Sequence, residues 1–270
     1  MLHAMGDPAF PRALTASALL ALIGNPAAAQ RPSSEQQHRV IEAAREAAVH
    51  YSSTLPDFLC TENVERSDTT GPKIMKVDRL VIQLSYFGQK EKQKLVAMNG
   101  SPTQQPLESL EGLITSGEFG SLLLGIFDAS SAAQFEWKAS SNLHQHPAAV
   151  YSFKIARKRS HYMVGYRAGN GKLVWAGAGY HGEVVLDDET SRVLRLAAAA
   201  DDIPRNSGIL QSSVEVDYDF VEVAARKYLL PAHSESRMER SYRKIANTVN
   251  FVDYRKFEAS STIDFKPEDQ

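Results

Sequence analysis

The stretch Ser213-Val-Glu-Val-Asp-Tyr-Asp-Phe-Val-Glu-Val223 decides the fold class. Its larger apolar side chains alternate with acidic ones over most of its length. They are Val214, Val216, Tyr218 and Phe220. A period of two is the pattern of a strand with one buried and one solvent-facing side, so this stretch predicts an antiparallel sheet.

Extended patterns recur on both sides of this stretch and make the chain mainly β. Asn170-Gly171 between two of them is a strong hairpin signal. The predicted strands are 58–66, 73–87, 94–98, 133–139, 149–156, 161–168, 172–178, 183–186, 193–197, 213–223, 232–244 and 247–265. We expect a single curved antiparallel sheet, or incomplete β-barrel, of about ten strands.

Helical patterns occur at two places. Ser34 and Gln37 form a capping box, which predicts an amphipathic helix over 35–52. A second helical pattern begins at Pro106, and a third, over 118–128, is apolar around more than half of its circumference. We therefore expect a mid-chain helical pair that covers one face of the sheet, which gives an α+β fold with a minor helical part.

Composition indicates one domain without a strongly charged partner. With 270 residues and 43% hydrophobic side chains, the chain can bury a substantial core. Its formal charge of −2 gives no reason to expect nucleic acid as a partner. No linker or repeat divides 31–265, so we interpret this range as a single domain, followed by a short tail at 266–270.

The N-terminus has the pattern of an export signal. Arg12 precedes the short apolar run 14–23, and Ala27-Ala28-Ala29 fits a small-residue cleavage site. The run is too short for a transmembrane segment, which needs about 20 residues. We therefore predict a signal peptide at 1–29 and a periplasmic or secreted protein. The alternative is an N-terminal helix that the mature protein retains.

Cys60 is the single cysteine, so the chain cannot form an intramolecular disulfide. Its apolar neighbours Phe58 and Leu59 predict a small buried side chain. A reactive thiol is the alternative.

Motif searches give no catalytic site, no cofactor site and no metal site. The glycines of 177–182 match a dinucleotide fingerprint by letter, but a strand follows them where a helix would have to hold the phosphates. His144 and His146 lie in a predicted loop, where no third metal ligand is near in sequence. The acidic pairs of 187–188 and 201–202 lie in predicted turns, where aspartate is common. We expect a protein that is not an enzyme.

The order of elements resembles the periplasmic lipoprotein-carrier superfamily, which includes LolA, LolB and RseB. The matching segments are the strand pair 182–196 with its Leu-Asp-Asp-Glu-Thr-Ser-Arg-Val-Leu-Arg turn and Leu-Leu-Pro at 229–231. Leu-Pro-Asp-Phe-Leu-Cys-Thr at 55–61 and two later motifs, at 99–102 and 117–123, resemble a group of exported acidobacterial proteins. The carrier resemblance implies an incomplete barrel around an apolar cavity under helices.

Two functional hypotheses follow. The first is a non-catalytic periplasmic protein that binds a lipid, an acyl chain or another apolar molecule in the half-barrel. Its candidate ligand contacts are Phe119, Leu122, Leu123, Ile126, Phe127, Phe135, Trp137, Tyr151 and Phe153, which would otherwise form the core. The second is an envelope scaffold that binds another protein through its sheet edges or through the basic 154–167 hairpin.

Overall fold

A computed structural model describes residues 31–114 and 117–257, which belong to one compact unit. The segments 1–29 and 266–270, predicted as a signal peptide and a tail, lie outside the described residues, as do residues 258–265 of the predicted domain. These predictions therefore stay predictions.

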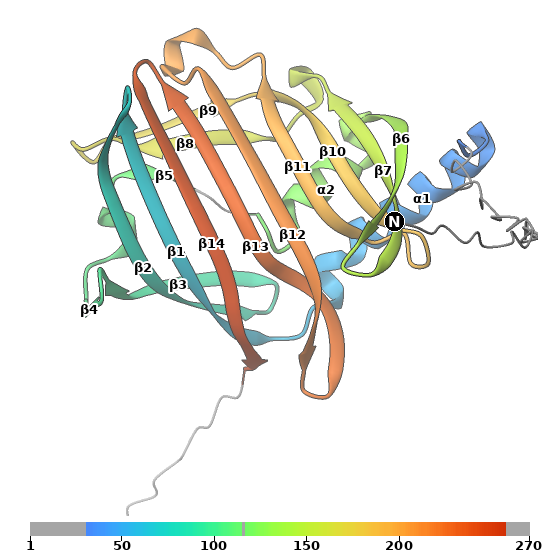
Figure 1. Ribbon diagram of the computed structural model, residues 1–270, viewed down its shortest axis with the longest axis horizontal. Helices are drawn as coiled ribbons and strands as arrows, with labels where there is room; N and C mark the ends of the chain where they lie inside the picture. Colours follow the sequence, from blue (N-terminus) through green and yellow to red (C-terminus); the bar gives the residue numbers. More distant parts are fainter. Residues whose placement is uncertain (1–30, 115–116, 258–270) are drawn as a thin grey trace, which may run out of the picture. The chain divides into compact units, whose positions relative to one another are not determined.

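Within the described ranges, eleven strands form one large antiparallel sheet. They are β1 (Phe58–Thr70), β2 (Lys73–Phe87), β3 (Lys90–Met98), β4 (Ser101–Pro102), β6 (Gln134–Leu143), β7 (His146–Ile155), β10 (Gly179–Asp187), β11 (Val193–Asp201), β12 (Gln211–Val223), β13 (Arg226–Arg240) and β14 (Arg243–Lys256). Their order is β4-β3-β2-β1-β14-β13-β12-β11-β10-β7-β6, so β4 and β6 are open edges (Figure 1). The prediction of a curved sheet that does not close is confirmed.

The stretch at 213–223 lies within β12, between β11 and β13. Val214, Val216 and Tyr218 are buried, while the acidic residues between them are partly exposed. The predicted alternation is therefore confirmed, and it places this strand near the middle of the sheet.

Two strands predicted for the main sheet belong instead to a second, three-stranded sheet. β8 (Met163–Arg167) pairs with β9 (Leu173–Gly177) on one side and with β5 (Gly112–Leu113) on the other. The expectation of one continuous sheet is corrected here. Local alternation identifies a strand, but it does not say which strand will pair with it.

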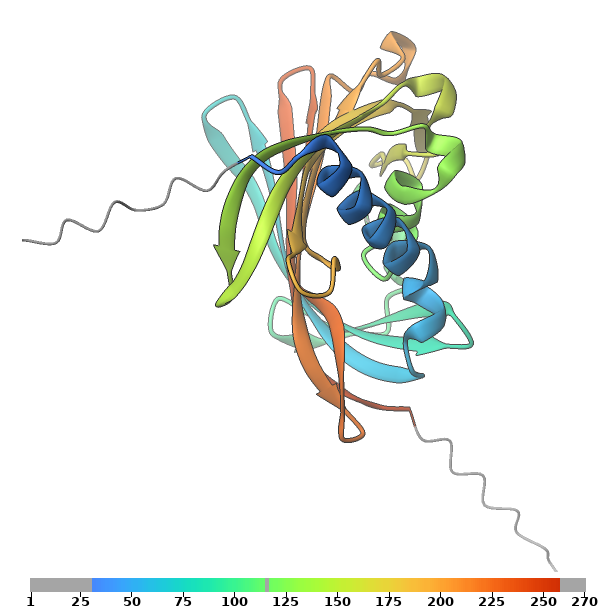
Figure 2. The same cartoon turned by 90° about the vertical axis from the view of Figure 1, so that its right-hand side faces the viewer.

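Helix α1 (Ser34–Thr54) is confirmed, with its cap one residue earlier than predicted. The capping box joins Ser33 to Gln36, because the Ser33 side chain accepts from the Gln36 backbone N–H while the Gln36 side chain reaches back. The helix buries Ile41, Ala44 and Ala48 along one stripe. Figure 2 shows α1 and the short helix α2 (Ser121–Phe127) on the same, concave side of the sheet.

The first member of the predicted helical pair is not an α-helix. After Pro106 the chain makes one 3-10 turn, Leu107–Ser109, and then enters β5, whose backbone pairs with β8. The backbone groups of this segment thus form hydrogen bonds with β8 instead of the hydrogen bonds of a helix. The second member starts only at Ser121, because Gly120 has a φ of 129°, outside the helical region.

The last two strands also differ from their predicted bounds. β13 begins before Pro231 and ends at Arg240, because the chain turns at Ser241–Tyr242. Pro231 has no N–H for the ladder, and the pairing with β12 shifts register beside it, between Asp217 and Tyr218. This bulge explains how β13 continues through Pro231, although the sequence pattern places a strand boundary at this proline.

Other short elements complete the structure, namely the 3-10 turns Ala129–Ser131, Arg157–Arg159 and Arg205–Ser207. The core has two main parts on the concave side. One lies where α1 and α2 cover β7, β10, β11 and β12, and the other gathers around Phe58 on β1, β2 and β14. Among the described residues, no helix is long and apolar enough to cross a membrane.

Candidate functional site: a carboxyl-lined cleft

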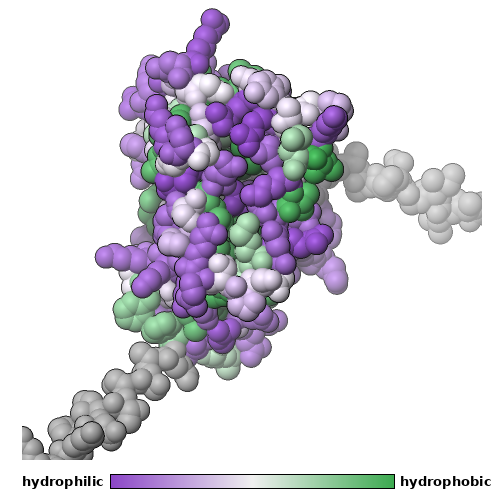
Figure 3. Space-filling model, turned by 90° about the vertical axis from the view of Figure 1, so that its left-hand side faces the viewer, coloured by the Kyte–Doolittle hydropathy of each residue, from purple (hydrophilic) through white to green (hydrophobic). Residues whose placement is uncertain are grey.

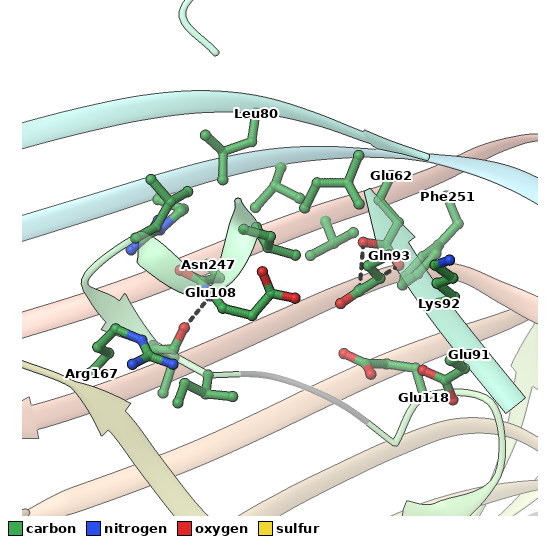
Figure 4. A pocket seen from close by; sticks show the side chains of 18 residues that line it. Glu62, Leu80, Glu91, Lys92, Gln93, Glu108, Glu118, Arg167, Asn247 and Phe251 are labelled. Atoms are coloured by element: carbon green, nitrogen blue, oxygen red, sulfur yellow. Dashed lines mark hydrogen bonds between the residues drawn. The ribbon is translucent and has the colours of Figure 1, made fainter. Parts of the chain in front are cut away.

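A cleft of about 470 Å³ opens between the concave side of β1, β2, β3 and β14 and the mid-chain segment that includes β5. Figure 4 shows its side chains. They are Glu62, Val64, Arg66, Leu80, Ile82, Glu91, Lys92, Gln93, Leu107, Glu108, Leu110, Leu113, Ile114, Glu118, Arg167, Asn247, Val249 and Phe251. Half of these eighteen residues are apolar, so the cleft has a mixed wall.

Strand alternation explains which side chains face the cleft. On β1, Glu62 and Val64 follow the buried Phe58 and Cys60 at intervals of two residues, so all four lie on one side of the strand. Leu80 and Ile82 occupy the same side of β2, opposite Val64 and Glu62 in the ladder. The floor of the cleft is therefore part of the same sheet face that packs the core, at a place that the helices do not cover.

Glu62 is the best-defined polar group of this floor. It is 4% exposed, and the Gln93 side-chain amide donates to both of its carboxyl oxygens, at 3.0 and 2.9 Å. Burial raises the pKa of Glu62 to about 7, although the Gln93 hydrogen bonds act in the opposite direction. At neutral pH this carboxyl group is therefore close to half protonated.

Two further carboxyl groups lie near Glu62. Glu118 is 7% exposed, and burial raises its pKa; Ser234 Oγ donates to its Oε1 at 3.4 Å. Glu91 lies at the exposed rim, and desolvation, with a smaller contribution from the neighbouring Glu118, raises its pKa to about 7. Glu118 contributes to the raised pKa values of both Glu62 and Glu91, because a nearby negative charge disfavours a second one.

Two of the three cations of the cleft bind backbone oxygens, while Lys92 lies beside Gln93 (Figure 4). Arg66 donates to the backbone oxygen of Glu111, and Arg167 Nη1 donates to that of Gly171 at 3.0 Å. Among the described residues, no Lys, Arg or His nitrogen lies within 4.0 Å of a carboxyl oxygen of Glu62, Glu91 or Glu118. The described part of the chain also holds no group of three acidic, histidine or cysteine side chains that fits a metal ion.

Two larger hollows lack such buried carboxyl groups. One, of about 610 Å³, lies over β11 to β14 and is lined mostly by small and polar side chains. The other, of about 550 Å³, lies where α1 meets Leu123, the turn before β11 and the start of β13. Neither contains an acidic side chain that is buried, so the 470 Å³ cleft is the site with distinctive chemistry.

The nine residues predicted as ligand contacts lie elsewhere in the molecule. None of them lines the cleft. The buried members are Phe119, Leu123, Ile126, Phe127, Tyr151 and Phe153, and the half-buried ones are Leu122, Phe135 and Trp137. Phe127 stacks on Phe135 with ring centroids 5.3 Å apart, which brings α2 against the β6 and β7 end of the sheet. Their role in ligand binding stays a prediction.

Other residues that the sequence analysis considered as functional candidates lie in ordinary strands and turns. Gly179 and Gly182 lie in β10, so the glycine-rich segment leads into a strand as predicted. His144 and Gln145 form the turn between β6 and β7, both with positive φ. Asp187 is buried, and it accepts from the backbone N–H and the hydroxyl of Thr190, at 2.8 and 2.6 Å.

The basic segment 154–167 is not a β-hairpin. It leaves the main sheet at the end of β7, makes the exposed 3-10 turn Arg157–Arg159 and enters β8 of the second sheet. The prediction of a hairpin is corrected, because β7 pairs with β6 and β10 and not with β8. Buried Cys60, by contrast, fits the prediction of a small core side chain.

Comparison with known proteins adds little to this geometry. No protein-family model matches the sequence, and no curated protein is similar to it. A LolA superfamily protein from Nitrosomonas europaea aligns over 83% of this chain and 94% of its own, with 8% identity and a TM-score of 0.36. A DUF1329 family protein from Desulfovibrio piger aligns over 82% and 95%, with 12% identity and a TM-score of 0.41.

A domain assigned to outer membrane lipoprotein sorting, from Vibrio parahaemolyticus, aligns over 81% of this chain and 92% of its own. Its identity is 13% and its TM-score 0.41. Likenesses this distant carry no argument about function, which has to come from the cleft itself.

Proposed function

We propose that the protein is a non-catalytic carrier that binds an apolar molecule, such as a lipid or an acyl chain, in the 470 Å³ cleft. The cleft is the observation that supports this proposal. Its volume lies within the range of about 300–1,000 Å³ that is usual for small-molecule sites. The export signal predicted at 1–29 would place this binding in the periplasm.

The apolar wall provides the binding energy in this proposal. Leu107, Leu110 and Leu113 line the cleft together with Val249 and Phe251. Burial of apolar surface contributes roughly 25 cal/mol per Å², so a chain that covers this wall gains several kcal/mol. On the face shown in Figure 3, hydrophilic residues cover most of the coloured surface and hydrophobic ones show in small patches.

Uptake of the neutral dye phenylnaphthylamine by the purified protein tests the proposal. We expect the dye to bind, and Leu110→Asp to weaken its binding roughly tenfold or more, since the new carboxylate would be desolvated by the ligand. Leu124→Asp is the matched control, because Leu124 is exposed on α2 and lies outside the cleft. Absence of dye uptake, or equal loss in both variants, would reject the cleft as a ligand site.

Native mass spectrometry after purification from a periplasm gives an independent test. An apolar species that copurifies with the protein, and that is lost in Leu110→Asp, would support the proposal. A protein without any such species that also fails to take up the dye would contradict it.

A second candidate function is binding of another protein through the turn Arg157–Arg159. All three side chains are exposed, and among the described residues none has an acidic partner within 4.0 Å. Crosslinking in cells should then capture a partner that is lost when all three become glutamate. A partner retained by this triple variant would exclude the turn as the interface.

A further inference from the structure

We propose that the ligand of the cleft is an amphiphile with a primary ammonium head group, which Glu62, Glu91 and Glu118 hold at one end while its chain lies along the apolar wall. This inference rests on the proposed function and specifies its ligand class. It goes beyond an apolar fit, because it assigns a binding role to the acidic groups of the cleft.

The three glutamates converge from separate elements. Glu62 comes from β1, Glu91 from β3, and Glu118 from the segment that leads into α2. Figure 4 shows all three at one end of the pocket and Arg167 at the other. Segments far apart in sequence therefore concentrate hydrogen-bond acceptors at one end of an otherwise largely apolar space.

Among the described residues no ion pair within 4.0 Å involves these three carboxyl groups, although Lys92 also lies at this end (Figure 4). The described partners of Glu62 and Glu118 are the neutral Gln93 amide and the neutral Ser234 hydroxyl. A buried carboxylate is costly unless a cation or several donors accompany it. A ligand that brings positive charge would thus gain more here than a neutral one.

Asn247 provides a second, independent observation. It is 5% exposed, it lines the same cleft, and its Oδ1 has no hydrogen-bond partner among the described residues. Its Nδ2 donates to the Leu113 backbone oxygen at 3.3 Å, so the amide orientation leaves the acceptor free. An unpartnered buried acceptor is unusual in a folded protein and indicates that the ligand also supplies a donor along its length.

An ammonium group fits these acceptors better than a metal ion does. It carries three N–H donors on a flexible stem, whereas a metal ion needs ligands at short, fixed distances. The three glutamates do not form such a compact set within the described residues. The ammonium can instead donate to carboxyl groups that are spread around the end of the cleft.

Titration of the glutamates gives the inference a measurable signature. Because Glu62 and Glu91 have pKa values raised to about 7 by desolvation, they are partly protonated at neutral pH. A bound cation favours their charged forms, so binding should release protons. Arg66, Lys92, Glu108 and Arg167 also line the cleft.

Isothermal titration calorimetry with four probes of equal chain length tests the head group. The probes are decylamine, decyltrimethylammonium, decanol and decanoate. We expect decylamine to bind roughly tenfold or more tighter than decanol, because hydrogen bonds to charged groups are the stronger ones. Decanoate should bind weakest, and decyltrimethylammonium should lie between, since it has the charge without the N–H donors.

The variants separate the head-group inference from the proposed carrier function. Glu118→Gln should reduce the preference for decylamine over decanol, whereas Glu65→Gln, on the other side of β1, should leave it unchanged. Titration in buffers of different ionisation enthalpy should show proton release for decylamine and decyltrimethylammonium but not for decanol, because only the first two bring a positive charge. Equal binding of decylamine and decanol overturns the head-group inference only, while failure of all four probes overturns the carrier function as well.

Discussion

The hydroxyl of Tyr218, on β12, donates to the backbone oxygen of Glu118 at 3.0 Å across one hundred residues of sequence. Tyr218 is fully buried, and its ring meets Tyr51 of α1 edge to face at 6.0 Å. One side chain thus joins the middle of the sheet, the first helix and the segment that carries a cleft carboxyl group. The position of Glu118 therefore depends on packing in the sheet centre.

Tyr218→Phe should destabilise the protein by about 1–3 kcal/mol, because it leaves the buried Glu118 carbonyl without its donor. Urea denaturation followed by circular dichroism measures this change. Dye uptake by the cleft should weaken as well, since the segment before α2 loses its anchor.

Tyr151→Phe is the matched control. Tyr151 is also buried, but its hydroxyl has no hydrogen-bond partner among the described residues. Removal of an unpaired hydroxyl should be neutral or stabilising. A loss of stability in Tyr151→Phe as large as that in Tyr218→Phe would show that the hydroxyl of Tyr218 has no special role.

Glu62 should make the protein less stable as the pH rises. Its pKa is raised from 4.5 in the unfolded chain to about 7 in the folded one, so the folded state binds more protons between these values. The free energy of unfolding therefore falls from pH 4.5 to pH 7 and changes little beyond, as far as Glu62 is concerned. Glu62→Gln should stabilise the protein by about 1–3 kcal/mol at pH 8 and have little effect at pH 4.5.

Urea denaturation at the two pH values checks this prediction. Glu65→Gln is the control, because Glu65 is exposed on the same strand. A stability change in Glu62→Gln that is equal at pH 4.5 and pH 8 would contradict the role of burial.

Gly182 should not tolerate alanine, because an added Cβ would overlap the backbone oxygen of Ala197 on the paired strand β11. The backbone would have to move, and we expect a loss of about 1–3 kcal/mol in thermal denaturation. Gly177→Ala is the control, since its Cβ would meet only Met163 Sδ at an ordinary 3.6 Å. Similar melting temperatures for the two variants would count against close packing at Gly182.

Cys60 should be inert in the folded protein. It is 1% exposed, and burial raises its pKa well above the usual range, so little thiolate is present. A thiol reagent should label it only after denaturation, whereas a cysteine placed at the exposed Ser141 should react at once. Rapid labelling of Cys60 under native conditions would show that β1 opens locally.

Local pattern sufficed where a residue's neighbours in sequence decide its environment. The alternation in 213–223 predicted β12, and the spacing of apolar residues in 35–52 predicted α1. It was insufficient around Leu107, where a helical spacing became a 3-10 turn and a strand because β8 offers partners for the backbone. Pairing between distant strands is invisible to a period measured along the chain.

The sequence by itself determined a mainly β fold with one long helix, a buried thiol and an open-ended series of antiparallel strands. The sequence also contained one indication of the cleft. Glu62 follows the two-residue spacing of Phe58, Cys60 and Val64, which are all buried on one side of β1. That Glu91 and Glu118 join it there follows from the tertiary structure alone. The reason is physical: a carboxyl group's charge state depends on burial and on groups brought close by folding, and neither is a property of its neighbours in sequence.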